Sequence, residues 1–314
     1  MPDSTLSSPR PRFSDPDWTA DGEPRARVEL KALRTLWFNT GTLCNLACAH
    51  CYIESTPKND ALVYLRHDEV RTYLDEIADA GLPTEEIGLT GGEPFMNPDI
   101  LAIMEDVLER GFRLLVLTNA MTPMWHRRAG LLALRERFGD RLTLRVSVDH
   151  FRRTRHEEER GPRSWAPMLR GLKWLCEQGF AVHVAGRTRW GEDEDALRAG
   201  FATLFAEHGI TIDAQDPHAL VLFPEMDPAA AVPEITTACW EKLGVSPDDM
   251  MCASARMVVK RKGAAHAVVL ACTLLAYDPR FELGRTLAEA TRTVRLNHPH
   301  CAKFCVLGGG SCSA

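Results

Sequence analysis

The sequence lacks a long run of uncharged apolar residues, an apolar signal core near its start and an excess of basic side chains. Without the first it has no candidate membrane span, and without the second it is not expected to be secreted. We therefore expect a cytoplasmic protein with no membrane partner. Lysine and arginine number 37 against 43 aspartate and glutamate, and this net charge of −6 argues against nucleic acid as a partner.

The composition is otherwise that of a globular protein, with 45% hydrophobic and 25% charged residues. A chain of 314 residues is longer than one hydrophobic core usually fills. We therefore expect one large domain that carries a smaller one, and the sequence shows no internal repeat.

Cysteine is the unusual residue, with ten copies that fall mainly into two groups. The first group is Cys44, Cys48 and Cys51. The second group is Cys252, Cys272, Cys301, Cys305 and Cys312. The number alone allows disulfides, zinc or catalysis, but cytosolic chains seldom form disulfides and often use clustered cysteines as metal ligands. The sequence thus favours metal, whereas the isolated Cys176 and Cys239 are expected to be ordinary small hydrophobic residues.

Short apolar runs alternate with helical patterns through the middle of the chain. The expected strands are 33–38, 86–90, 111–118, 142–148, 180–185 and 219–223. The expected helices are 68–80, 99–110, 125–138, 165–178 and 195–208. Regular alternation with short connections predicts a parallel sheet with right-handed crossovers, so we expect an α/β fold, a partial (βα)6 TIM-like barrel.

The two ends of the chain do not follow this alternation. Residues 1–31 are rich in Pro, Ser, Asp and Arg and are predicted to be a flexible tail, before a barrel domain over 32–234. Residues 235–314 are predicted to form a small α+β subdomain with a hairpin that turns at Gly263 and a last helix near 286–296.

The first cysteine group directly follows the first expected strand, where a parallel barrel carries its reactive loops. Three thiolates within eight residues lack the nearby fourth ligand of a tetrahedral zinc site. Iron–sulfur clusters are held by thiolates at comparable spacings, and three thiolates leave one iron of a four-iron cluster open.

The segment Cys44-Asn-Leu-Ala-Cys48-Ala-His-Cys51-Tyr52 resembles the CxxxCxxC signature of the radical S-adenosylmethionine (SAM) enzymes. The resemblance implies a 4Fe–4S cluster on the three cysteines, with SAM on the open iron and Tyr52 beside it. It also implies reductive cleavage of SAM to a 5′-deoxyadenosyl radical, which takes a hydrogen atom from a substrate. Such an enzyme needs a low-potential electron donor of the flavodoxin or ferredoxin type.

Further motifs follow the later strands. The sequence Gly91-Gly92-Glu93-Pro94 resembles the family's GGEP motif, whose backbone and carboxylate receive the SAM amino group. The two glycines allow a close backbone approach, and a carboxylate is a good acceptor for an ammonium group.

Weaker resemblances predict the rest of the SAM pocket. Asn119 follows the third strand, Ser147 and Asp149 end the fourth, and Arg187 follows the fifth with a fork suited to the SAM carboxylate. The family pattern places the serine and the acid near SAM and substrate, so Asp149 and the following His150 are the predicted catalytic residues. His150 departs from the family pattern, and an ordinary polar loop residue is the alternative for it.

A charged segment, His156-Glu-Glu-Glu-Arg160-Gly161, resembles a family motif that precedes the fourth helix. A solvated charged loop is the alternative to a direct role in catalysis, because charge runs usually face water.

The second cysteine group resembles in layout the twitch and SPASM extensions of the family, which hold auxiliary iron–sulfur clusters. We expect one auxiliary 4Fe–4S cluster in a twitch-like subdomain. The predicted ligands are Cys252, Cys272, Cys301 and Cys305, with Cys312 as the alternate or terminal ligand. A structural zinc site stays open as the alternative, because His298 and His300 lie beside Cys301 and zinc accepts mixed ligands.

The substrate is not identified by the sequence. A short tail before the barrel, in place of a peptide-recognition domain, favours a small molecule over a peptide, so a peptide maturase is the alternative within the enzyme class. A noncatalytic iron–sulfur or zinc module is the alternative from another class.

Overall fold

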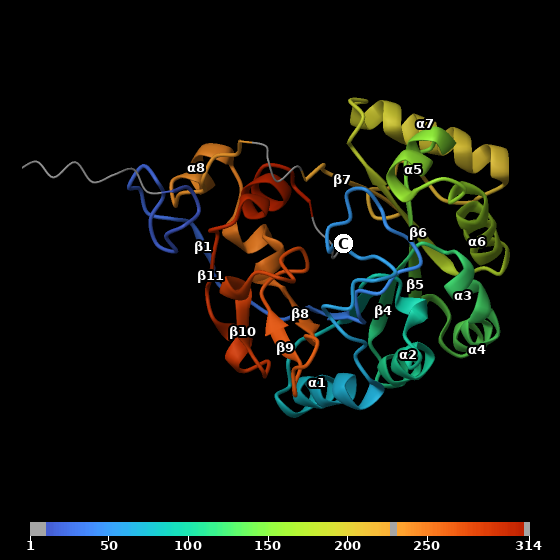
Figure 1. Cartoon of the computed structure of the whole chain (residues 1–314), viewed down its shortest axis with the longest axis horizontal. Helices are drawn as coiled ribbons and strands as arrows, with labels where there is room; N and C mark the ends of the chain where they lie inside the picture. The colour runs from blue at the N-terminus through green and yellow to red at the C-terminus, as the bar shows by residue number, and fades with distance from the viewer. Residues whose placement is uncertain (1–10, 227–230, 311–314) are drawn as a thin grey trace, which may run out of the picture.

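The computed structural model describes residues 11–226 and 231–310. Its main feature is a nine-stranded sheet in the order β10-β9-β8-β2-β3-β4-β5-β6-β7 (Figure 1). These strands are β2 (Thr35–Asn39), β3 (Glu86–Thr90), β4 (Arg113–Thr118), β5 (Leu142–Asp149), β6 (Ala181–Arg187), β7 (Leu220–Phe223), β8 (Ala255–Val259), β9 (Val268–Leu270) and β10 (Glu282–Gly284). The helices are α1 (His67–Asp79), α2 (Ile100–Glu109), α3 (Thr122–His126), α4 (Arg128–Phe138), α5 (Arg153–Arg160), α6 (Trp165–Glu177), α7 (Glu194–His208) and α8 (Cys239–Leu243). In the part of the chain that the structure describes, none of the helices has the length and apolar character needed to cross a bilayer.

Strands β2 to β7 pair in parallel and in chain order, which confirms the predicted partial barrel. Helices α1, α2, α4, α6 and α7 follow the outer side of the sheet (Figure 1). Because the strands are parallel, their carboxyl ends lie together, and the loops that follow them share one edge of the sheet.

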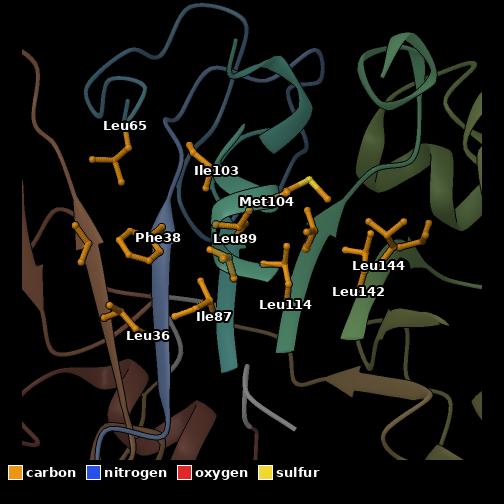
Figure 2. Packing of buried hydrophobic residues seen from close by; sticks show 14 of the residues in the cluster. Leu36, Phe38, Leu65, Ile87, Leu89, Ile103, Met104, Leu114, Leu142 and Leu144 are labelled. Carbon is orange, nitrogen blue, oxygen red and sulfur yellow. The ribbon is translucent and has the colours of Figure 1, made fainter. Parts of the chain in front are cut away.

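Alternation within the strands places the hydrophobic core between sheet and helices. Leu36 and Phe38 of β2, and Ile87 and Leu89 of β3, are fully buried on this side (Figure 2). Burying each such side chain contributes about 2 kcal/mol. Trp37 of β2, Leu115 of β4 and Met257 of β8 belong to a second apolar cluster, on the other side of the sheet.

The C-terminal segment extends the same sheet. Strand β8 pairs in parallel with β2, and β9 returns antiparallel to β8, so the predicted hairpin is observed. Gly263 lies in its turn with φ of 79°, a conformation that glycine adopts without strain. Because β8, β9 and β10 lie in the same sheet as β2 to β7, the domain limits 32–234 and 235–314 remain a prediction.

Two of the predicted helices differ from the structure. The helix expected near 286–296 is wrong: the chain there has one 3₁₀ turn (Glu289–Thr291) and strand β11 (Val294–Arg295). Strand β11 pairs with β1 (Arg27–Val28), a long-range contact that overrides the local pattern. The helix expected at 125–138 is interrupted at Arg127, with α3 before it and α4 after it.

The predicted flexible tail is also wrong for residues 11–31, which pack against the rest of the molecule. Ala26 and Val28 are buried, and the fully buried Arg25 forms an ion pair of 2.5 Å with Glu234. The pattern of Pro, Ser and charged residues conceals these contacts because each depends on a partner far along the chain. Residues 1–10 of the predicted tail lie outside the described part.

Candidate active site

The loop after β2 carries the first three cysteines to one cavity. Cys44, Cys48 and Cys51 line a cavity of about 160 Å³, and Tyr52 lies beside them in its wall. The cavity is closed on other sides by residues from the sheet and from the C-terminal segment. These include Trp37, Leu117, Phe223, Thr273, Leu274 and Phe304.

Main-chain and side-chain N–H groups point at the cysteine sulfurs. Leu46 N lies 3.4 Å from the Cys44 Sγ, and Ser55 N lies 3.3 Å from the Cys51 Sγ. Asn119 Nδ2 approaches the Cys44 Sγ at 3.9 Å. Hydrogen bonds to sulfur are one of the means by which proteins stabilise thiolates that hold iron. The donor set therefore fits an iron–sulfur cluster.

Burial raises the pKa of Cys44 to about 12, and burial also raises the pKa of Cys48. The nearby Arg160 acts in the opposite direction on Cys48. These thiols are therefore protonated at neutral pH unless a metal ion supplies positive charge. Within residues 11–226 and 231–310, no three His, Cys, Asp or Glu side chains are placed to hold a single metal ion. An iron–sulfur cluster does not require its thiolates to share one metal ion, because each iron binds its own thiolate.

Helix α5 fixes the cysteine loop from outside. The Glu159 carboxylate accepts a hydrogen bond from His50 N at 2.9 Å and lies 2.9 Å from the His50 Nδ1. The Glu159 carbonyl accepts a hydrogen bond from Ala49 N. On the other side, Arg187 Nη1 donates to the His50 carbonyl at 3.0 Å. The loop is thus held at His50, between Cys48 and Cys51.

Gly91 and Gly92 line the cavity as predicted, and the structure gives a further reason for them. A Cβ on Gly92 would lie 2.2 Å from the Leu43 carbonyl oxygen, and a Cβ on Gly91 would lie 2.5 Å from that of Gly41. Gly92 N donates to the Gly41 carbonyl. The glycines therefore let the end of β3 pack directly against the cysteine loop.

Glu93 and Pro94 do not line the cavity. The buried Glu93 carboxylate accepts hydrogen bonds from Thr118 Oγ1 and Asn119 N, both at 2.8 Å. Burial raises the pKa of Glu93 to about 7, against the effect of these hydrogen bonds. Its role in this structure is to orient Asn119, which does line the cavity and donates to Asn45 Oδ1 at 2.9 Å.

The ends of β5 and β6 supply a buried ion network in the cavity wall, where Ser147 also lies. Asp149 Oδ2 accepts from Arg160 Nε at 2.5 Å, and Asp149 Oδ1 accepts from Arg187 Nε at 3.2 Å. Burial alone would raise the pKa of Asp149, but Arg160 and Arg187 outweigh it and the pKa lies below its usual value. Asp149 therefore stays ionised and positions the two arginines. Its φ of 60° is unusual for a residue with a side chain and directs the chain away from the strand.

His150 lies outside the cavity wall, so the structure does not bring this predicted catalytic residue to the site. It is fully buried, stacks on Phe151 with ring centres 4.3 Å apart, and contacts Trp190. Its Nε2 lies 3.2 Å from Glu192 Oε1. The imidazole fills the packing between two loops.

Tyr52 links the cavity to the C-terminal segment. The Arg187 guanidinium lies 4.5 Å from the centre of its ring, and the Tyr52 hydroxyl donates to the Pro224 carbonyl at 3.3 Å. The ring also contacts Phe304 edge to face. A cationic guanidinium over an aromatic face is a favourable contact.

Sequence reasoning did not assign Glu159 or Arg160 to the site, and it did not expect Thr273 or Phe304 there. The charged segment 156–161 was the signal for the first two, because its resemblance to a family motif pointed beyond a solvated loop. For the other two no local signal exists, since only the fold brings them to the cavity.

Four cysteines of the second group meet at a separate small cavity. Its lining includes Cys252, Cys272, Cys301, Cys305 and His300. Burial raises the pKa of Cys252 to about 11 and that of Cys301 to about 12. The His300 Nδ1 is buried and makes no hydrogen bond with the described residues. Together these four thiols and the unsatisfied ring nitrogen fit a bound metal group.

The remaining predicted ligands do not join this cavity. Cys312 lies outside the described residues, and His298 does not line the cavity: its Nδ1 accepts a hydrogen bond from His300 N at 3.0 Å. The nine described cysteines form no disulfide. Among the described side chains, no three of these potential ligands are placed to bind a single zinc ion.

A partial barrel of parallel strands, with three cysteines in the loop after its first strand, is typical of a class of iron–sulfur proteins. The profile of the radical SAM superfamily matches residues 38–188, the segment that contains the cysteine loop and the ends of β2 to β6. The chain belongs to the radical SAM superfamily. Members of this superfamily are enzymes that use a 4Fe–4S cluster and SAM.

Two curated relatives illustrate the range of similar proteins. The antilisterial bacteriocin subtilosin biosynthesis protein AlbA of Bacillus subtilis is 34% identical over 143 residues, which is 45% of this chain and 30% of AlbA. The AdoMet-dependent heme synthase of Methanosarcina barkeri is 31% identical over 144 residues, which is 45% of this chain and 38% of that protein. The matched segments thus span less than two fifths of either relative.

Solved structures share the fold over most of the chain. Streptococcus suis SuiB bound to the precursor peptide SuiA matches 82% of this chain and 63% of SuiB, with a TM-score of 0.58 and 14% identity. The structure of anSMEcpe with bound AdoMet matches 83% of this chain and 80% of that chain, with a TM-score of 0.57 and 13% identity. At these identities the similarity shows the fold.

Proposed function

We propose that this protein reductively cleaves SAM to a 5′-deoxyadenosyl radical and takes a hydrogen atom from a substrate held in the barrel. The observation that carries the proposal is the wall of the main cavity, where three thiols, two of which accept N–H hydrogen bonds, stand beside Asn119, Ser147 and Arg187. A 4Fe–4S cluster on Cys44, Cys48 and Cys51 supplies the electron and the open iron for SAM.

The chain's own side chains bind, orient and exclude water. Arg187 presents a cation to the cavity, held in place by Asp149, and suits the SAM carboxylate. The apolar side chains of Trp37, Leu117 and Phe304 keep water from the space where a radical would act. Asp149 acts as a positioning residue, and His150 has no catalytic part in this proposal.

We further propose one auxiliary 4Fe–4S cluster on Cys252, Cys272, Cys301 and Cys305. Four thiols at one cavity leave no iron open, which favours electron transfer or support of the substrate cavity over substrate ligation. Leu274 lines both cavities, and Thr273 beside it lines the main one, so the segment after Cys272 is a wall of the substrate site.

The substrate that we favour is a small molecule, because the cavity that would also hold the cluster and SAM is walled on its other sides by the sheet and the C-terminal segment. A peptide maturase is the second candidate, favoured by the similarity to AlbA, whose name refers to bacteriocin biosynthesis, and to SuiB, which was solved with a precursor peptide. In that case one peptide side chain would enter the cavity. A superfamily member needs a reductant and a substrate; we propose a flavodoxin or ferredoxin type of donor and a cytoplasmic location.

The test is SAM cleavage by anaerobically reconstituted protein with dithionite. We expect about eight irons per chain and formation of 5′-deoxyadenosine in the wild type. Cys48→Ala should form none, while the matched control Cys176→Ala, a half-buried cysteine on α6, should behave as the wild type. Equal amounts of 5′-deoxyadenosine from wild type and Cys48→Ala would overturn the proposal.

The auxiliary cluster is tested by metal content. Cys272→Ala should retain about four irons per chain, while Cys239→Ala should retain about eight. Zinc in place of the second set of irons would contradict the auxiliary cluster and leave the main proposal intact.

A further inference from the structure

Arg256, the second residue of β8, is a buried cation beside the second cysteine group. Its side chain is 1% exposed. Nε donates to the Ala290 carbonyl at 2.9 Å, and Nη1 donates to the carbonyls of Cys252 at 2.6 Å and Ala255 at 2.8 Å. Nη2 lies 3.5 Å from the Arg292 carbonyl. The guanidinium is therefore held by neutral main-chain acceptors.

Arg256 differs from the buried Arg25, Arg160 and Arg187 in having no carboxylate partner in the described parts of the chain. Arg25 pairs with Glu234, and Arg160 and Arg187 both pair with Asp149. The ionisable groups that act on Arg256 are the thiols of Cys252 and Cys272. A buried charge without a counter-charge is strongly destabilising, so an anionic group is expected to complete this site.

We propose that Arg256 is a positioning residue whose fixed positive charge partly neutralises the metal–thiolate group held by the four C-terminal cysteines and raises its reduction potential. The inference depends on the auxiliary cluster proposed above. A four-iron cluster on four thiolates is an anion, and one-electron reduction adds a negative charge. A nearby cation therefore stabilises the reduced state more than the oxidised state.

The choice of arginine follows from the same contacts. Its planar fork binds carbonyls from two segments at once, the turn at Cys252 and the stretch from Ala290 to Arg292, while the charge stays in place. A lysine would keep the charge but satisfy fewer of these carbonyls. Charge and geometry are thus separable by substitution.

The experiment isolates the auxiliary cluster in full-length protein with Cys44, Cys48 and Cys51 all replaced by alanine. After anaerobic reconstitution, iron per chain is measured and the potential is determined by titration with dithionite, followed by electron paramagnetic resonance. Arg256→Gln should shift the potential to a lower value. Arg256→Lys should keep a potential near that of the parent, although it loses part of the fork.

Arg198→Gln is the matched control. Arg198 is a buried arginine on α7 that also donates to carbonyls, those of Ala214 and Leu220, but it pairs with Glu194, whereas Arg256 donates to the carbonyl of Cys252. Its replacement should lower stability and leave the potential unchanged.

If Arg256→Gln binds too little cluster for a potential to be determined, the unfolding midpoint with and without reconstitution is measured instead. The rise in unfolding midpoint on reconstitution should be smaller in Arg256→Gln than in the parent and unchanged in Arg198→Gln, because only Arg256 would gain a counter-charge.

An unchanged potential in Arg256→Gln, or a lysine variant that behaves as the glutamine variant does, would overturn the role of Arg256 while leaving the cluster in place. Absence of iron in the parent would instead refute the auxiliary cluster itself.

Discussion

At the scale of residues, the cysteines were found from their spacing, but the groups that hold them were not. Cys44, Cys48 and Cys51 lie close together in the sequence, so the spacing alone predicted a shared site. Glu159 acts through His50, a residue far along the chain, and its only sequence signal is the charged segment 156–161. Arg256 acts from a buried position that no local pattern marks. The individual charged residues near the cysteines are therefore the part of the site that only the three-dimensional structure reveals.

Glu159→Ala should destabilise the protein by about 2 kcal/mol, because it leaves His50 N and Nδ1 without their acceptor. The reconstituted variant should also lose iron faster in air, since the cysteine loop is held less firmly. Urea unfolding and iron content are the measurements. The neighbouring Glu158→Ala, whose partner Arg155 is exposed, should change stability by less than about 0.5 kcal/mol. Equal effects of the two variants would contradict the role of Glu159.

His156 should make the stability depend on pH. Its ring lies against Trp165, its Nδ1 lies 2.6 Å from the Val148 carbonyl, and burial, aided by Arg160, lowers its pKa to about 4 from the usual 6.5. Above pH 6.5 its contribution is complete. Between 6.5 and 4 the unfolded chain binds the proton and the folded one does not, so up to about 3 kcal/mol is lost as the pH falls.

The measurement is urea unfolding of wild type and His156→Asn at pH 7 and pH 4.5. Asparagine retains a donor for the Val148 carbonyl and does not titrate in this range. The wild type should lose more stability than the variant on acidification. Parallel losses in the two proteins would show that His156 is not responsible.

At the scale of elements, the buried strands were the most predictable part. β3 was predicted at 86–90, as observed, because a short apolar run between turn signals has few alternatives. Helix α5 was not predicted, since its sequence Arg-Thr-Arg-His-Glu-Glu-Glu-Arg has no apolar stripe. Two buried side chains, His156 and Glu159, attach it to the barrel instead. Elements that depend on polar contacts thus escape a reading based on hydrophobic periodicity.

Gly171 lies at a close contact between α6 and the segment that follows β4. A Cβ at this position would lie 1.9 Å from the Ala120 carbonyl oxygen, which cannot move without shifting the neighbouring Asn119. Gly171→Ala should therefore cost about 2 kcal/mol in stability and weaken SAM binding. Thermal unfolding and calorimetric titration with SAM are the measurements.

Gly130→Ala is the matched control on helix α4. Its Cβ would meet only the end of the Leu101 side chain, which can rotate away, and alanine favours helix. The control should be close to neutral. A neutral Gly171→Ala would show that the contact between α6 and β4 is less tight than the structure indicates.

At the scale of the whole molecule, the N-terminal segment packs against residues from the last third of the chain, and each stabilises the other. Strands β1 and β11 pair, and Glu234 accepts hydrogen bonds from Phe13 N and Ala20 N, both at 2.6 Å, besides its ion pair with Arg25. The predicted division into tail, barrel and appendage missed this because composition reports only average character. The segments predicted to be the tail, the barrel and the appendage therefore pack together.

Glu234→Gln should destabilise the protein by about 3 kcal/mol, because it leaves the buried Arg25 without a counter-charge. Asp60→Asn, which removes the exposed partner of Lys262, should cost less than about 0.5 kcal/mol. Denaturant unfolding checks both. If the two variants lose equal stability, the buried pair does not carry the contact between the N-terminal segment and the rest.

The parallel pairing of β8 with β2 also has a consequence for synthesis on the ribosome. One edge of β2 stays unpaired until the chain has been made as far as Val259, although β2 is made before the other strands of this sheet. Domains begin to fold from the N-terminal side during translation, and an unpaired strand edge is prone to wrong association. The nascent barrel therefore passes through a stage at which the strand that leads into the cysteine loop has an open edge, a period in which chaperones and the proteins that deliver iron and sulfur would have access to it.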